Sequence, residues 1–258
     1  MARVARGGSP SGAASPRPRL RVVRRVLLGV AALAAGALAL VVHPQPLFAY
    51  TLQRGNIVLH ARAPLPPEAT PMLDDAIARV RRSPLYDAAR THHVFLCDTP
   101  ALYGFFSRWH NSGGVTHTWA TGNVFIRPAD VRRGRVFDRF GHEKGGERTL
   151  AYFVAHEVTH AMTADRVGRW RTSRLAPFQS EGYADYVAYA RAVDLPRGRA
   201  DLQAGTAEMD PGRSGLYDRY RLLVGYLLQR RGLSVDELLA RRMDRGEVER
   251  QLVGDVGL

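Results

Sequence analysis

The sequence predicts an α+β protein in which one membrane-spanning helix precedes a small mixed sheet, and the sheet precedes a mainly helical half. An uncharged apolar run occupies residues 26–42. Apolar residues then alternate with polar ones in short segments, as they do in strands. From about residue 147 they recur at three- and four-residue steps, as on the buried face of helices. We expect a basic tail, residues 1–25, a transmembrane anchor, residues 26–42, and one domain, residues 50–258.

The apolar run near the N-terminus predicts a retained single-pass anchor. As a helix, residues 26–42 would span roughly 26 Å, the short end of what crosses a bilayer. Seven arginines and no acidic residue precede the run, so the positive-inside rule places the N-terminus in the cytoplasm and the domain outside. A cleaved signal peptide, which would give a secreted protein, is the alternative. The run is longer than the usual signal-peptide core, and Leu47-Phe48-Ala49 is a poor cleavage site.

The basic composition does not indicate a nucleic-acid partner. The formal net charge is +13, but seven of these charges belong to the arginines before the apolar run, which leaves +6 for the remainder. The basic residues are arginines almost throughout, with Lys144 as the only lysine, and no nucleic-acid-binding motif is present. Residues 1–25 are rich in Arg, Gly, Ser and Pro, which predicts disorder.

The domain after the anchor must be stabilised without disulfides. Cys97 is the only cysteine, so no intrachain disulfide can form. About 210 residues follow the anchor, which suffices for one domain with a sizeable core. The sequence carries no internal repeat and no signal for an oligomeric state.

The first half of the domain carries the strand signals. Residues 56–62 alternate as a strand does, and prolines then end the segment before a helix near residues 70–82. Residues 93–97 predict a second strand. Residues 115–120 and 124–127 predict a hairpin that turns at Thr121-Gly122-Asn123.

The most informative motif is His156-Glu157-Val158-Thr159-His160. Apolar residues around it recur at helical spacing, which predicts a helix over residues 147–166 that begins near Glu147, because an acidic residue suits a helix N-terminus. Two histidines four apart lie one turn apart and about 40° around the axis. That separation suits two Zn–N bonds of about 2.0–2.1 Å from one helix face.

A catalytic zinc has three protein ligands and keeps an open position, so a third ligand is expected downstream. The metzincin pattern fails, because Thr163 and Arg166 stand where that pattern has its glycine and third histidine. A second helical stretch begins 20 residues after His160 with Ser180-Glu181-Gly182-Tyr183-Ala184-Asp185-Tyr186. With this stretch, the chain resembles the gluzincin superfamily, the thermolysin-like and aminopeptidase-like metallopeptidases, over roughly residues 147–192.

The resemblance implies a zincin-like catalytic domain and assigns roles to five residues. His156, His160 and Glu181 would bind zinc. Glu157 would be the general base and later the proton donor, and Asp185 would hydrogen-bond the far nitrogen of a ligand histidine. Each residue also has a structural interpretation as a buried or solvated side chain, and a zinc site without turnover is a further alternative. Glu157 argues against that last alternative because it is not a ligand.

Gluzincins commonly stabilise the oxyanion with a Tyr or His placed after the third ligand. Tyr217 is the first candidate and Tyr220 the second, since both lie where a later helix opens; a core or surface role is the alternative for each. Gluzincins also form one edge of the cleft with a strand ahead of the metal helix, and an extended peptide pairs with that strand. We match this edge to residues 120–125, with the substrate-binding residues Ala120, Thr121, Gly122 and Asn123; an ordinary hairpin is the alternative.

The rest of the chain predicts helices near residues 179–192, 214–231 and 234–242. Ser234 and Glu237 have the spacing of a capping box at the start of the last one. Residues 200–213 are polar and contain glycine, which favours a loop over the cleft.

These observations predict a membrane-anchored zinc-dependent peptidase that hydrolyses peptide bonds of a peptide or protein substrate outside the cytoplasm. The first alternative is an anchored protein that binds zinc or peptide without cleaving it. The second is an exported peptide-binding or assembly factor that uses the hairpin edge and carries the histidine motif incidentally. The sequence does not specify the substrate or distinguish exo- from endopeptidase activity.

Overall fold

The computed structural model describes residues 18–144, 146 and 148–258. The chain forms two compact units, residues 1–43 and residues 44–258. Among the described residues, one helix is long and apolar enough to cross a membrane or to serve as a signal sequence: Val22–Val42, with a mean hydropathy of 2.3.

This segment belongs to α1, Pro18–Val42. The helix begins before the predicted start of the apolar run, so residues 18–25 are helical and the prediction of disorder was wrong for them. Arginine, leucine and the apolar run that follows can propagate one continuous helix, because each added residue contributes a hydrogen bond once the helix is nucleated. The other residues of the predicted tail, 1–17, lie outside the described residues.

The second unit is α+β and contains the predicted mixed sheet. Its five strands have the order β1-β2-β3-β5-β4. The neighbours β2, β3 and β5 are parallel, whereas β1 and β4 pair antiparallel at the two edges. The strands are β1 Tyr50–Arg54, β2 Ile57–Ala61, β3 His92–Leu96, β4 Gly114–Thr116 and β5 Val124–Ile126.

The structure confirms the strands predicted at residues 56–62 and 93–97 and the hairpin between β4 and β5. The first strand of that hairpin is shorter than predicted and ends at Thr116. The carbonyl of His117 accepts hydrogen bonds from the amides of Ala120, Thr121 and Gly122, so the chain turns directly after β4. A second, small sheet was not predicted; it comprises β6 Ala129–Asp130, β7 Arg135–Phe137 and β8 Glu143–Lys144.

One face of the five-stranded sheet packs against the two helices α2, Ala69–Val80, and α4, Leu150–Val167. Alternate strand residues such as Leu59, Val94 and Ile126 are fully or almost fully buried there. On other strand positions, aromatic rings pack with α3, Pro100–Ser107: Phe106 stacks on Phe125 with ring centroids 4.0 Å apart. The sheet is therefore covered by a helical layer that carries the motif and, separately, by an aromatic layer.

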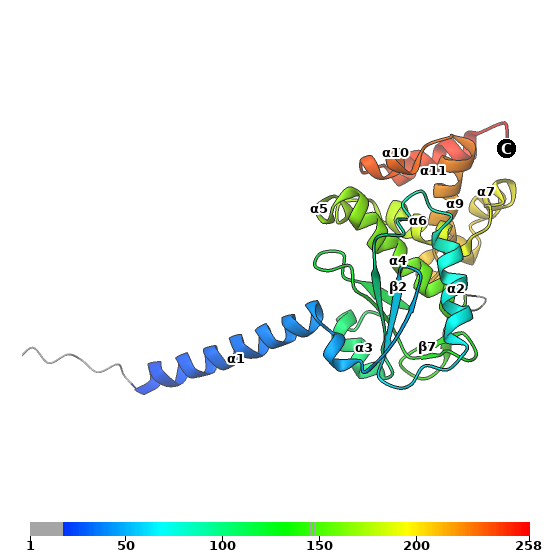
Figure 1. Cartoon of the computed structure of the whole chain (residues 1–258). Coiled ribbons are helices and arrows are strands. Elements are labelled where there is room, and N and C mark those ends of the chain that lie inside the picture. The colour runs from blue at the N-terminus through cyan, green and yellow to red at the C-terminus, as the bar shows by residue number, and fades with distance from the viewer. Residues whose placement is uncertain (1–17, 145, 147) are drawn as a thin grey trace, which may run out of the picture. The chain divides into compact units, whose positions relative to one another are not determined.

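The remaining helices gather at one end of the sheet, in the green-to-red part of Figure 1. The helices predicted near residues 179–192, 214–231 and 234–242 are present, and Ser234 and Glu237 form the predicted capping box. Residues 200–213 are mostly helical rather than a loop. The helices are α5 Arg169–Thr172, α6 Pro177–Tyr189, α7 Leu195–Ala204, α8 Pro211–Ser214, α9 Asp218–Gly225 with a π-helical continuation Tyr226–Arg230, α10 Val235–Ala240 and α11 Arg245–Gly254.

Candidate metal centre

Helix α4 carries the histidine motif along the middle of the domain. It begins at Leu150, because the hydroxyl oxygen of Thr149 accepts the amide of Tyr152 at 3.3 Å and caps the helix. The predicted start near residue 147 was therefore about one turn too early, and Glu147 itself lies outside the described residues. Val154 and Val158 are fully buried against the core, which leaves the histidines on the neighbouring face.

Helix α6 supplies the third member of the site and depends on a close helix crossing. A Cβ atom at Gly182 would lie 2.4 Å from the backbone oxygen of Tyr220 in α9. A glycine at this position lets the two backbones approach more closely than any side chain would permit. Glu181 precedes this glycine, so the crossing helps to hold its side chain beside α4.

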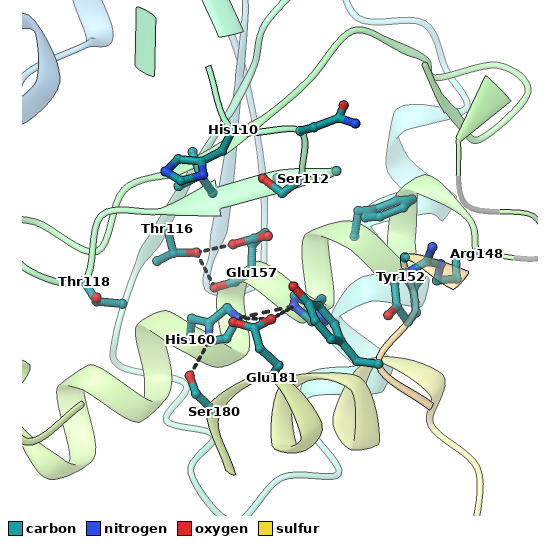
Figure 2. Close-up of a pocket in the computed structure, with 18 of the residues that line it drawn as sticks. His110, Ser112, Thr116, Thr118, Arg148, Tyr152, Glu157, His160, Ser180 and Glu181 are labelled. Carbon is teal, nitrogen blue, oxygen red and sulfur yellow. Dashed lines mark hydrogen bonds and ion pairs between the residues drawn. The ribbon is translucent and has the colours of Figure 1, made fainter. Parts of the chain in front are cut away.

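His156, His160 and Glu181 form a group that could hold a metal ion, with ligand atoms within 4.8 Å of one another. Nε2 of His156 lies 3.2 Å from Nε2 of His160 and 3.3 Å from Oε2 of Glu181. Nε2 of His160 lies 3.6 Å from the same oxygen. Figure 2 shows His160 and Glu181 directed toward this common point. Residues from two helices thus present three donor atoms to one position.

Each histidine is also held from its other ring nitrogen. Nδ1 of His156 lies 2.9 Å from Oδ1 of Asp185, a carboxylate that is 1% exposed. The hydroxyl of Tyr152 donates a hydrogen bond to the same Oδ1 atom. Nδ1 of His160 lies 3.3 Å from the hydroxyl oxygen of Ser180. Partners of this kind fix the tautomer and the orientation of an imidazole, which leaves Nε2 for a metal.

The pKa values of His156 and Glu181 show that the group favours bound positive charge. Burial lowers the pKa of His156, but hydrogen bonding to Asp185 and Glu181 outweighs burial and raises this pKa to about 10. Burial raises the pKa of Glu181, but the charge of His160 and the hydrogen bonds from both histidines hold it well below its usual range. The carboxylates therefore stabilise positive charge between them. A metal cation bound to the same atoms would displace the proton from His156.

Glu157 lies on α4 between the two histidines and points to β4 instead of the donor group. Its Oε2 atom accepts a hydrogen bond of 2.7 Å from the hydroxyl of Thr116. A Cβ atom at Gly114 would lie 2.6 Å from Cγ and 2.9 Å from Oε1 of Glu157. A Cβ atom at Gly113 would lie 2.2 Å from the ring of Phe153. The edge strand can therefore approach α4 only because both positions are glycine.

A cavity of about 590 Å³ opens over the donor group. Its walls combine the segment from His110 through β4, one face of α4, the start of α6 and the residue before α9. The lining residues are His110, Asn111, Ser112, Gly113, Gly114, Val115, Thr116, Thr118, Lys144, Arg148, Tyr152, Phe153, His156, Glu157, His160, Thr172, Ser173, Ser180, Glu181, Pro211, Gly215 and Tyr217.

The predicted substrate-binding residues do not line this cavity. Ala120, Thr121, Gly122 and Asn123 form the loop that connects β4 to β5. The strand beside the donor group is β4, because β4 is the outermost strand at this side of the sheet and packs on α4. The hairpin is present as predicted, and the cavity is lined by its other part, where Gly113 and Gly114 allow close approach to α4.

Tyr217 lines the cavity and lies beside a candidate ligand. Its ring stacks on the His156 ring, with centroids 6.1 Å apart and planes 14° apart. Burial raises the pKa of the Tyr217 hydroxyl, and the nearby carboxylate of Glu181 raises it further, so the group stays protonated and can donate a hydrogen bond. Tyr220 stacks behind it with centroids 5.7 Å apart and does not line the cavity.

Thr116, Ser180 and Tyr152 contact members of the site, but sequence reasoning gave them no role. Ser180 and Thr116 lay inside segments that had been singled out, yet nothing in the sequence shows which side chain meets which histidine or carboxylate. Comparison of the chain with known protein families, with curated proteins and with solved structures finds no match.

Proposed function

We propose that this protein is a membrane-anchored zinc metallopeptidase of the gluzincin type. One geometric observation carries the proposal. Two ligand atoms of a tetrahedral zinc ion with bonds of about 2.0–2.1 Å lie about 3.3–3.4 Å apart. The three donor atoms of His156, His160 and Glu181 lie 3.2, 3.3 and 3.6 Å apart. Two neutral imidazoles and one carboxylate are also a donor set that zinc prefers in catalytic sites.

Zinc in this position supplies a Lewis acid that acidifies water and polarises a carbonyl group. Glu157 acts as the general base. The Thr116 hydroxyl holds Oε2 of Glu157, so Oε1 accepts a proton from the attacking water and later delivers it to the leaving amine. Tyr217 donates a hydrogen bond from its hydroxyl to the oxygen that becomes negatively charged.

The edge strand favours a peptide as the substrate. β4 ends the strand order on this side of the sheet, and its residues Gly114 to Thr116 line the cavity. An extended peptide can add to such an edge by backbone hydrogen bonds, which provide affinity with little sequence choice. The scissile bond would then lie over Glu157, because Gly114 brings the strand against this side chain.

The apolar part of α1 supports the anchoring part of the proposal. Its candidate membrane-spanning segment Val22–Val42 has 21 residues and would span about 32 Å, whereas the uncharged run after Arg25 has 17 residues and would span about 26 Å. The hydrocarbon core of a bilayer is roughly 30 Å thick. The arginines that precede the apolar run favour an N-terminus in the cytoplasm and a peptidase domain on the other side.

The test is the zinc content of the purified full chain in detergent, measured beside peptide cleavage on the same samples. We expect about one zinc per chain in the wild type and in Glu157→Gln, much less in His160→Ala, and cleavage in the wild type alone. Circular dichroism of all three proteins controls for folding. One zinc without cleavage would favour the zinc-binding alternative, whereas a folded wild type that takes up no supplied zinc would refute the metal site and the proposal.

A further inference from the structure

Three large aromatic side chains that the catalytic proposal does not use are exposed around α3. Phe105 is 41%, Trp109 75% and Trp119 52% exposed. The Phe105 ring packs edge-on against Phe106, with centroids 5.0 Å apart. The Trp119 ring lies 5.9 Å from the His117 ring, whose Nε2 is 2.8 Å from the carbonyl oxygen of Phe106. We call Phe105, Trp109 and Trp119 the aromatic surface.

The backbone holds Trp109 on the outside of the domain at an energetic cost. Arg108 and Trp109 have φ angles of 51° and 63°, so two consecutive non-glycine residues are left-handed. This conformation is sterically unfavourable for a residue that has a Cβ atom. A Cβ atom at Gly104 would lie 2.6 Å from the Trp109 ring, so the indole occupies space that only a glycine leaves open. Hydrogen bonds to the carbonyl of Gly104 stabilise this turn, so a large apolar ring is fixed in an exposed position, as in surfaces that contact a partner.

A short stretch of chain links α1 to a residue that packs on α3. Only His43 separates Val42, the last residue of α1, from Pro44, the first residue of the second unit. Phe48 follows shortly after and is 4% exposed. Its ring packs 5.0 Å from Phe95 and 6.4 Å from Phe106 of α3. Six residues of chain reach at most about 22 Å, so the connection from Val42 to Phe48, which packs on α3, is short.

We propose that the aromatic surface lies in the headgroup region of the bilayer that α1 spans. Tryptophan prefers this region because its ring is apolar while its N–H finds polar partners. The exposed guanidinium of Arg108, next to Trp109, can pair with lipid phosphate. The residues that follow, His110 to Ser112, line the cavity, so the rim of the cleft would lie close to the lipid. The proposal rests on the anchoring part of the proposed function and is independent of zinc and cleavage.

The three tryptophans of the chain allow a direct test. Trp170 in α5 is 71% exposed and serves as a matched control, because α5 and α3 lie at separate places in the domain (Figure 1). One single-tryptophan chain retains Trp109 (Trp119→Phe with Trp170→Phe), and the other retains Trp170 (Trp109→Phe with Trp119→Phe). Both full-length chains are reconstituted into phosphatidylcholine vesicles, with and without lipid brominated near the headgroup, and flotation first establishes that they are bound.

We expect brominated lipid to quench Trp109 fluorescence at least twofold and to leave Trp170 nearly unchanged. The water-soluble quencher acrylamide should show the reverse order. The wild type is measured in parallel, so that the test stays informative if a substitution disturbs folding. Brominated lipid should quench the fluorescence of two of its tryptophans, Trp109 and Trp119, and acrylamide should quench that of the third, Trp170. A floating chain whose Trp109 is quenched by acrylamide and not by brominated lipid would overturn the proposal. A chain that does not float would refute the anchor and this proposal together, while zinc content and cleavage would still report separately on the peptidase.

Discussion

Oδ1 of Asp185 lies 2.9 Å from Nδ1 of His156, and the hydroxyl of Tyr152 donates a hydrogen bond to the same oxygen. Two helices therefore contribute a buried series of contacts that ends at a candidate metal ligand. The carboxylate orients the imidazole and keeps its proton on Nδ1, which leaves the lone pair of Nε2 for zinc.

We predict that Asp185→Asn weakens zinc binding about 10–100-fold, because an amide stabilises the ligand imidazole less than a carboxylate does. Competition with a chromophoric chelator measures the affinity. The exposed Asp74, which pairs with Arg54 far from the site in sequence, provides the control Asp74→Asn. Equal zinc affinities of Asp185→Asn and the control would contradict the proposed role.

Tyr217→Phe should lower kcat about 10²-fold and leave the zinc content unchanged, because the substitution removes one donor to the oxyanion and retains the ring that stacks on His156. Steady-state kinetics with one peptide substrate gives kcat and KM. Tyr220→Phe should behave like the wild type, since Tyr220 does not line the cavity. If Tyr217→Phe turns over at the wild-type rate, another group stabilises the oxyanion.

Gly114→Ala should reduce cleavage at least tenfold without loss of zinc. The added Cβ would lie 2.6 Å from Cγ of Glu157, so either the base or the edge strand must move, and small displacements of catalytic groups are costly. Zinc content and kcat/KM are measured together. Full activity would show that the strand can shift freely, which would remove β4 from the substrate site.

Gly182→Ala should destabilise the fold by about 1–3 kcal/mol or more, because its Cβ would meet the backbone of Tyr220 at 2.4 Å and force α6 and α9 apart. A Cβ atom at Gly254 in α11 would have no neighbouring atom within 4 Å, so Gly254→Ala is a matched control and should be neutral or slightly stabilising. Urea unfolding of the zinc-free proteins gives both values. Similar midpoints for the two variants would show that the helix crossing tolerates a side chain.

Acid should destabilise the domain through His60. Burial, and then the charge of His93, lower the pKa of His60 from 6.5 to about 4. Between these values the unfolded chain binds more protons than the folded one, so stability falls as the pH falls from 6.5 to 4, by about 1–3 kcal/mol. His60→Phe keeps a ring to stack on Phe95 and removes the titration.

The difference in melting temperature between pH 7 and pH 5 should therefore be smaller for His60→Phe than for the wild type. The exposed His142 gives the control His142→Gln, which should keep the wild-type difference. Loss of zinc at low pH affects all three proteins alike, so the comparison isolates His60. An unchanged pH dependence in His60→Phe would show that His60 does not cause the acid effect.

Several parts of the fold and the site were predictable because they depend on neighbours in the chain. The strands near residues 57–61 and 92–96 follow from local alternation, and the capping box of Ser234 and Glu237 follows from a three-residue spacing. The predicted grouping of His156 with His160 follows from one turn of helix. The small sheet β6-β7-β8 was missed, because strands of two or three residues are too short to show a period.

The sequence alone determined the features whose geometry is set within one helix or strand. These are the apolar segment that ends at Val42, the helix α4 and the pairing of its two histidines as candidate metal donors. The tertiary structure decided which distant residues meet them. It placed β4, and not residues 120–123, beside Glu157, and it brought Ser180 and Asp185 to the two histidines. The physical reason is that helix periodicity is local, whereas these contacts depend on backbone approach between elements far apart in the chain, which the glycines at 114 and 182 allow.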